Sequence, residues 1–394
     1  MPGWHERTKE LQQQGTVLML GITQEQHPER CRLFMQWKQM EWPVLVDSLD
    51  LLDVSVVPIT LLIDEHGIIR AKAPKSSDLE EFLALSYEMP EDVVEPGATP
   101  LLGSLRTRAR RVGSGPAWLA YGDALFLWGG EARLDEMVAA YQEALRLSLD
   151  PGRAHFRLGT VLRRRFESIH RRPGDFRAAV EQWQAALDLD PNQYIWRRRI
   201  QQYGPRRDKP YPFYDWVARA REEITARGGT PVPLPVDPVG AEIAHPARSF
   251  PAVGERPEEP DPQSRIRRDP GRFIAVETTV VPPRVAPGES VRVHLALRPV
   301  TEKKAHWNNE AKDLVVWVDP GQGVAVDRQY LSVANPDQEV SQETRKLEFE
   351  VRLPEGAEGT ALQVSAYALY YVCEDVDGTC LYRRQDIPVT IPLK

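Results

Sequence analysis

The residues of this sequence best suited to covalent chemistry are two cysteines near its C-terminal end. Cys373 and Cys380 lie seven residues apart, on either side of an acidic turn that contains Gly378. A glycine there allows a tight reversal that brings two strand-borne sulfur atoms within bonding range. The pair is therefore the candidate catalytic site, for thiol-disulfide exchange. A structural disulfide across a hairpin, or two reduced thiols, are the alternatives. The acidic Asp375 and Asp377 weaken the case for a fast nucleophile, because negative charge raises a thiol pKa.

The third cysteine, Cys31, stands near the start of an expected helix, between two arginines. The helix dipole and the arginine charges would both favour a thiolate. Phe34 and Met35 share its face, however, and we expect Cys31 to act as a small buried apolar side chain.

Histidines and acidic residues show no spacing that would bind a metal. His5, His27 and His66 have no cysteine or carboxylate companion at ligand spacing, so we expect surface histidines. The sequence also shows no phosphate-cradling glycine loop, no dinucleotide motif and no Ser/His/Asp set. It predicts no cofactor and no metal, and it argues against hydrolases, kinases and dehydrogenases.

The charge balance argues against a general affinity for nucleic acid. The formal net charge is -7, from 50 basic and 57 acidic residues. Arginine clusters occur at residues 106–111, 163–165 and 197–199, and interleaved acidic residues favour solvated helix faces there. No apolar run is long enough for a membrane span, and residues 1–7 show no secretory signal. The sequence as it stands indicates a cytoplasmic protein, or a periplasmic or extracytoplasmic one if the true start lies upstream.

The expected elements behind these candidates change in character twice along the chain, whose 394 residues suffice for several domains. Up to residue 70 a helix, two strands with a helix between them, and a β-hairpin follow one another. Residues 17–22 and 43–47 are continuous apolar runs, typical of strands buried on both faces of a sheet. A short helix with Leu49, Leu51 and Leu52 should follow the second strand.

The segment that leads into this hairpin contains Val57, Pro58 and Thr60. With the order of elements around it, this motif resembles the thioredoxin-like fold of the redoxins, the peroxiredoxin-like and TlpA-like proteins. The resemblance spans residues 4 to about 88 and implies that Pro58 is the cis-proline of that family. In redoxins the catalytic cysteines precede the helix with which this sequence opens. The resemblance thus implies thiol-disulfide oxidoreductase ancestry without the N-terminal Cys-x-x-Cys, which we expect upstream of Met1.

The middle of the chain changes to a helical period. Residues 89–116 are rich in proline, glycine and arginine and predict a linker. Residues 117–227 then show two helix pairs with small residues at Gly122 and Gly159, which resemble tetratricopeptide (TPR) repeats. A capping helix should contain Trp196 and Tyr203. The resemblance implies a platform for a protein partner.

The last part of the chain is predicted to be all β. Residues 228–272 form a proline-rich linker, and residues 273–394 contain short alternating strands separated by turns, which predicts an immunoglobulin-like β-sandwich. Residues 306–310 should lie in one of its loops. The final strands, with Cys373 and Cys380, resemble the N-terminal domain of DsbD-type thiol-disulfide interchange proteins, where a cysteine pair bridges a hairpin.

The sequence therefore predicts a multidomain protein: a partial thioredoxin-like α/β domain at 1–88, TPR helical hairpins at 117–227 and a β-sandwich at 273–394. Two functions remain open. The first is thiol-disulfide exchange, with Cys373 and Cys380 as the remaining pair and a thiol or disulfide client as substrate. The second is a non-catalytic scaffold that binds a protein partner through the repeats and the sandwich.

Overall fold

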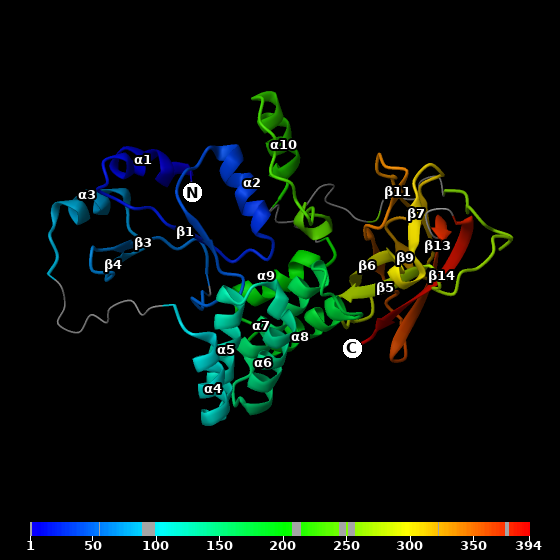
Figure 1. The fold of residues 1–394 in the computed structure, drawn as a ribbon, viewed down its shortest axis with the longest axis horizontal. Helices are drawn as coiled ribbons and strands as arrows, with labels where there is room; N and C mark the ends of the chain where they lie inside the picture. The colour runs from blue at the N-terminus through cyan, green and yellow to red at the C-terminus, as the bar shows by residue number, and fades with distance from the viewer. Residues whose placement is uncertain are drawn as a thin grey trace.

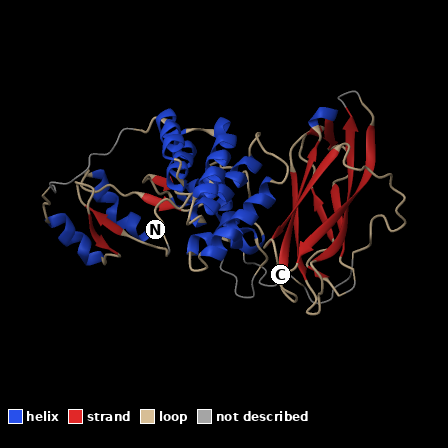
Figure 2. Cartoon of the chain, turned by 90° about the horizontal axis from the view of Figure 1, so that it is seen from below, coloured by secondary structure: helices blue, strands red, loops and turns tan. Residues whose placement is uncertain are grey.

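The chain combines helices with mainly antiparallel sheets, arranged as three successive parts. The computed structural model describes residues 2–54, 56–88, 99–206, 214–243, 250, 257–321, 323–374 and 378–394. Within these ranges it contains ten α-helices and fourteen β-strands. An α/β part comes first, a helical part lies in the middle, and a part made almost wholly of strands follows (Figures 1 and 2).

The N-terminal part contains two small sheets that do not join. Strands β1 and β2 pair in parallel, whereas β3 and β4 form an antiparallel hairpin. The elements are α1 (Pro2–Gln13), β1 (Gly21–Thr23), α2 (Pro28–Lys38), β2 (Val44–Val46), β3 (Leu61–Ile63), β4 (Ile69–Lys72) and α3 (Ser76–Ala84). Helix α2 begins at Pro28, as expected. Proline suits the start of a helix because the N–H groups of the first turn have no partner within the helix, so the N–H that proline lacks costs no hydrogen bond.

Two expectations for this part are wrong in detail. The first strand is shorter than residues 17–22, and the residues after β2 form turns instead of a helix. The Asp47 carboxylate accepts backbone hydrogen bonds from Leu51 at 2.8 Å and Leu52 at 3.2 Å. A carboxylate that satisfies nearby N–H groups in this way stabilises a turn at the expense of a helix.

The helical part is held together by glycines at the points of closest helix contact. A β-carbon on Gly122 would lie 2.7 Å from the Tyr141 ring, and one on Gly159 would lie 2.6 Å from the Trp183 indole. The helices are α4 (Leu102–Val112), α5 (Gly115–Trp128), α6 (Leu134–Leu147), α7 (Gly152–Glu167), α8 (Asp175–Leu189) and α9 (Tyr194–Tyr203). Helices α5 and α6, α6 and α7, and α7 and α8 pack against each other in sequence order.

Helix α4 lies inside the stretch 89–116, for which the sequence predicts a linker. Its Ala109 is fully buried in the helical core, and Leu102 and Leu105 pack against that core. The three residues recur at the spacing of one helix face, and the arginines between them point to solvent. The predominance of arginine conceals this apolar stripe in the sequence.

Helix α10 (Trp216–Ala226) packs against α2. The Trp37 and Trp216 rings stack with centroids 5.7 Å apart. The chain then runs back along α2, where Gln36 bonds to the carbonyl of Thr230 at 2.8 Å and to the N–H of Val232 at 2.9 Å. The first part of the expected linker at 228–272 therefore crosses the surface of the N-terminal part.

The C-terminal part consists of two antiparallel sheets that share one apolar core. One has the order β10-β8-β13-β7-β11, with β14 paired to β13, and the other has the order β5-β6-β12-β9. Buried side chains from both sheets form the core, among them Trp307 and Phe349. The strands are β5 (Ile274–Val281), β6 (Ser290–Pro299), β7 (Ala305–Asn308), β8 (Leu314–Asp319), β9 (Ala325–Val326), β10 (Tyr330–Val333), β11 (Val340–Ser341), β12 (Arg345–Arg352), β13 (Ala361–Glu374) and β14 (Cys380–Pro392).

The segment expected to be a loop at residues 306–310 begins as strand β7. Trp307 is fully buried between the sheets, and its indole N–H donates to the carbonyl of Glu343 at 2.9 Å. Burial of one large ring with its polar atom satisfied explains why this segment is part of the sheet.

Across all the residues that the structure describes, no helix has the length and apolar character to cross a membrane.

The close contact at Gly159 generates a stability prediction. Replacing Gly159 with Ala should lower the free energy of unfolding by about 1–3 kcal/mol, because the added methyl group meets the Trp183 indole and the carbonyl of Ala179. Urea unfolding followed by circular dichroism measures this. Gly103→Ala is the matched control, since a β-carbon there meets nothing within 4 Å. If both substitutions lower the free energy of unfolding equally, the close contact at Gly159 does not cause the loss of stability.

Candidate functional site

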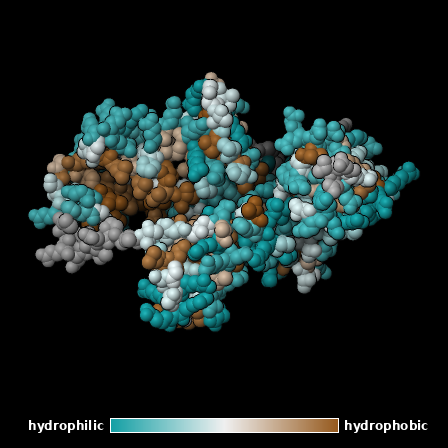
Figure 3. All heavy atoms as spheres, in the orientation of Figure 1, coloured by the Kyte–Doolittle hydropathy of each residue, from teal (hydrophilic) through white to brown (hydrophobic). Residues whose placement is uncertain are grey.

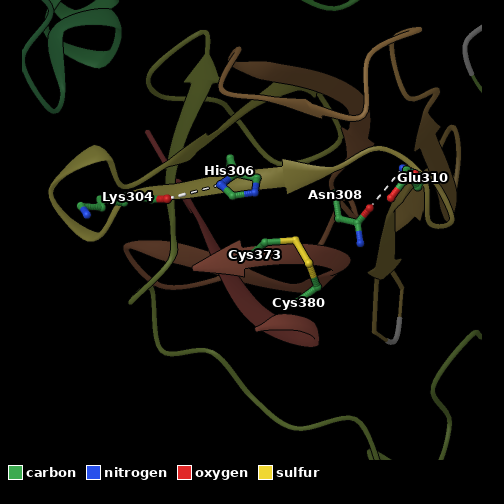
Figure 4. Close-up of a disulfide and its surroundings, with 6 residues drawn as sticks. All are labelled: Lys304, His306, Asn308, Glu310, Cys373 and Cys380. Atoms are coloured by element: carbon green, nitrogen blue, oxygen red, sulfur yellow. Dashed lines mark hydrogen bonds between the residues drawn. A yellow bond between two sulfur atoms is a disulfide. The ribbon is translucent and has the colours of Figure 1, made fainter. Parts of the chain in front are cut away.

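The predicted cysteine pair forms a disulfide at the end of the β13–β14 hairpin (Figure 4). Cys373 and Cys380 are cross-strand partners with α-carbons 3.9 Å apart and an S–S distance of 1.97 Å. Cys373 is buried and Cys380 is exposed. A thiolate from solution could therefore approach the hairpin from the side of Cys380. Asp375 and Asp377 lie outside the described residues.

The surroundings of the disulfide contain one imidazole. His306 of β7 lies opposite Cys373 in the sheet register, is buried, and has Nδ1 3.4 Å from the carbonyl oxygen of Lys304 (Figure 4). Arg272 lies 3.6 Å from the carboxylate of Glu374, the residue next to Cys373.

The second predicted motif lies in the N-terminal part. The Val57–Pro58 peptide bond is cis, and both residues are exposed. Thr60 accepts a backbone hydrogen bond from Ala73 at 2.8 Å, which extends the β3–β4 hairpin by one pair. Strand β3 and the β13–β14 hairpin lie at opposite ends of the molecule (Figure 1), so the two predicted motifs do not form one site.

The N-terminal part exposes an unusual number of large apolar side chains, which we call the open apolar face. Ile22 of β1 and Leu45 of β2 are register partners, and both are more than 40% exposed. Ile63 and Ile69 are partners in the hairpin and are about half exposed. The full set is Leu18, Leu20, Ile22, Leu45, Leu51, Leu52, Val56, Val57, Ile59, Leu61, Ile63 and Ile69. Hydrophobic side chains gather over this part of the surface in Figure 3.

The open apolar face contradicts the expectation of strands buried on both sides. In the described residues β1 pairs only with β2, and β3 pairs only with β4, so each of these strands keeps one unpaired edge. Helix α2 covers one face of the β1–β2 pair, where Cys31 and Met35 lie near Val44 and Val46. The other face has the composition of a sheet interior and no cover among the described residues.

Cys31 is half-buried in this layer, and burial, followed by the charge of Glu25, raises its thiol pKa. A raised pKa disfavours the thiolate, which agrees with the expected role as a small apolar residue.

Among the described residues, no group of three or more histidine, cysteine or acidic side chains is placed to hold a metal ion.

A buried polar junction that the sequence did not predict joins the N-terminal part to the helices. His27 was expected at the surface, but it is buried and its Nε2 lies 3.0 Å from the Tyr203 hydroxyl. Arg199 was expected on a solvated helix face, but it is 2% exposed and donates to the carbonyl of Gln24 at 2.9 Å and to the side chain of Gln26. Isolated charge signs in a sequence do not reveal which arginines find buried acceptors.

A second polar junction joins the helices to the strands. His294 of β6 bonds through Nε2 to the carbonyl oxygen of Tyr203 at 2.8 Å, and Arg292 donates to the carbonyl of Gly204 at 2.9 Å. Arg163 and Arg165, also expected in solvent, are buried in α7. Burial lowers the pKa of His294 to about 4, although Glu348 and the Tyr203 carbonyl oppose this effect.

Comparisons with known proteins leave the chain without an identified family. No family model matches the sequence, and no curated protein matches it. Similar solved structures include the yeast GGA1 GAE domain (11% identity, TM-score 0.18, covering 30% of this chain and 92% of that one). They also include Spo0M, a sporulation control protein from Bacillus subtilis (15%, 0.15, 31% and 49%), and AvmM, which catalyses macrocyclization in alchivemycin A biosynthesis (12%, 0.17, 32% and 94%). Scores this low carry no argument about function.

The lowered pKa of His294 generates a pH prediction. The folded state keeps this ring neutral down to about pH 4, whereas the unfolded chain binds the proton near pH 6.5, so stability from this residue is lost as the pH falls between those values. The ring faces Glu348, Arg292 and Arg163 as well as the Tyr203 carbonyl. Relative to His294→Gln, which keeps a donor, the chain should lose up to about 3 kcal/mol between pH 7 and pH 4. The free energies of unfolding of the two proteins are measured in urea across this pH range. If they change in parallel with pH, the prediction is wrong.

Proposed function

We propose that this chain is a protein-binding scaffold of thioredoxin-like ancestry, whose N-terminal part binds an extended segment of a partner protein. The observation that carries the proposal is the open apolar face, where sequence segments with the composition of interior strands lie exposed. Large contiguous apolar patches on a protein surface mark interaction sites, because leaving them in water is costly.

The expected occupant is a polypeptide strand with apolar side chains. The free edges of β1 and β3 each present a row of backbone donors and acceptors, which is the template for strand addition. Main-chain hydrogen bonds to such an edge give affinity for any extended peptide, whereas the exposed Ile22 and Leu45 select apolar side chains. A globular partner with a polar surface would satisfy neither the edges nor the apolar side chains.

The rest of the chain supports this function as a rigid support. The helical part resembles TPR arrays in its glycine contacts, and its inner helices hold the loops after β1 and β2 by buried hydrogen bonds. Arg157, for example, donates to the carbonyl of Leu49 at 3.2 Å and pairs with Asp123 at 2.6 Å. The loops at one end of the β1–β2 sheet are thus fixed, while its apolar face remains accessible.

Selection of peptides from a random display library on the full-length chain tests the proposal. Selected peptides should be rich in apolar residues, and Leu45→Asp should weaken their binding by about tenfold or more, because one buried leucine side chain contributes about 1.5–3 kcal/mol. Fluorescence anisotropy with labelled peptides gives the dissociation constants. Hydrogen exchange should show new protection at the amides of β1 and β3.

Val340→Asp is the matched control, since Val340 is half exposed on β11 of the strand part, at the opposite end of the molecule from β3 (Figure 1). Equal loss of binding in both variants, or protection confined to other strands, would refute the proposed site. Sedimentation of the free chain shows whether a second copy covers the face instead, which would also refute a strand-binding role.

The disulfide, with Cys380 exposed, favours thiol-disulfide exchange as a second candidate function. In this reaction two thiols of a reductant are oxidised to a disulfide while the Cys373–Cys380 bond is reduced to two thiols. The exposed position of Cys380 at a hairpin end gives a thiolate an approach. A structural disulfide would have the same bond but would resist reduction by the glutathione pool.

Alkylation and mass spectrometry after equilibration in glutathione buffers of graded potential test this candidate. In a Cys31→Ser background, an exchange-active pair should titrate between about -180 and -300 mV. A pair that stays oxidised throughout that range is a structural disulfide, and the catalytic function is then excluded for this chain.

A further inference from the structure

A cavity of about 500 Å³ lies where the helices meet the second sheet and the segment at residues 235–242. Its volume is in the range of sites for small molecules. Phe166, Phe176 and Tyr203 supply aromatic surface from α7, α8 and α9, and Val236 and Leu295 add aliphatic surface. The cavity belongs neither to the open apolar face nor to the disulfide.

One end of this cavity carries more positive than negative charge. Arg163, Arg171, Arg298 and Lys346 line it together with two carboxylates, those of Glu167 and Glu277. Glu167 is shared, since it accepts from Arg163 and from Lys346, the latter at 2.8 Å. Glu277 pairs with Arg298 and also accepts the N–H of Gly174 at 3.1 Å. Four cationic groups thus face two carboxylates.

The remaining charged residues of the lining have ion-pair partners of their own. Arg30 pairs with Glu242 in a buried, two-pronged contact, and Asp237 pairs with Arg221 at 2.6 Å. Glu348 lies 3.1 Å from Arg292, which also pairs with Glu350. Over the whole lining five cationic groups face five carboxylates, so the positive excess is confined to the end around Arg171, Arg298 and Lys346.

Three of the cationic side chains lie at or near the hydroxyl group of Thr344. Arg171 and Arg298 each donate to Oγ1 of Thr344 at 3.2 Å, and Lys346 follows two residues later in the same segment. Arg171 has no carboxylate partner among the residues that the structure describes. Its charge also lowers the pKa of Arg298, after the larger effect of burial. Like charges held this close need a counter-charge.

Arg163 adds an unsatisfied donor to this end of the cavity. Its guanidinium is sandwiched among aromatic rings, 3.9 Å from the centroid of Phe176 and 4.6 Å from that of Tyr203. The side chain is about 5% exposed, and its Nε has no hydrogen-bond partner. A buried donor without a partner is costly, and an anion bound in the cavity could supply an acceptor.

We propose that this cavity binds a small phosphate monoester, with its phosphate among Arg171, Arg298 and Lys346 and its organic group against the aromatic and aliphatic walls. A phosphate dianion matches the excess of two positive charges and offers several acceptors to donors from separate segments. The cavity is larger than a phosphate ion, so its remaining space can hold an organic group. The ligand bridges the helical part, through Arg171, and the strand part, through Arg298 and Lys346.

Isothermal titration calorimetry of the full chain at constant ionic strength tests the proposal with phenyl phosphate, inorganic phosphate and succinate. Phenyl phosphate should bind most tightly. Arg171→Gln and Lys346→Gln should each raise its dissociation constant by about tenfold or more, the effect of losing one charge-assisted contact. Arg108→Gln, at an exposed arginine of α4, is the matched control and should change nothing.

Thr344→Val is a second test that keeps every charge. It removes the hydroxyl group that positions Arg171 and Arg298 and should also weaken phenyl phosphate binding. Melting curves without ligand identify variants that fail to fold, and Leu45→Asp should bind phenyl phosphate as the parent chain does. The proposal is overturned if the chain binds none of the probes, if inorganic phosphate or succinate binds as tightly as phenyl phosphate, or if the cavity variants behave like Arg108→Gln.

Discussion

The three parts of the chain meet at Tyr203, and the burial of its polar atoms constrains how they can be arranged. Its hydroxyl group bonds to His27 of the N-terminal part, and its carbonyl oxygen accepts from His294 of the strand part. Its ring stacks on Trp183 at 5.6 Å within the helical part. Because each of these groups would be costly to bury unpaired, moving either neighbouring part away breaks a bond that water must replace.

This arrangement explains why the N-terminal part is polar where it meets α7 and α9 and apolar where it is free. The loops after β1 and β2 carry Glu25, Gln26 and Ser48, which are buried against the arginines and amides of α7 and α9. Such contacts hold the ends of the strands and leave their faces uncovered. The apolar side chains, which usually drive a sheet into the interior, remain available for another polypeptide.

The sequence predicted local structure well wherever a residue has a local mechanism. Pro28 begins a helix, Gly122 and Gly159 lie at close helix contacts, and Cys373 and Cys380 oppose each other across a hairpin. It failed where the outcome depended on distant partners. Arg163 and Arg199 became buried because aromatic rings and backbone carbonyls far along the chain enclose them. The cavity could not be predicted either, since Arg171 lies more than 100 residues before Arg298 and Lys346 in the sequence.

By itself, the sequence determined the mixed helical and sheet composition, most helices and strands, and the pairing of the C-terminal cysteines as a possibility. These follow from periodicity, turn residues and spacing, which act over a few residues. Only the tertiary structure decided which apolar strands lack a cover, which charges are buried, and which cations share a cavity. The physical reason is that burial and charge pairing depend on the distance between side chains in space, which the order of residues along the chain does not specify.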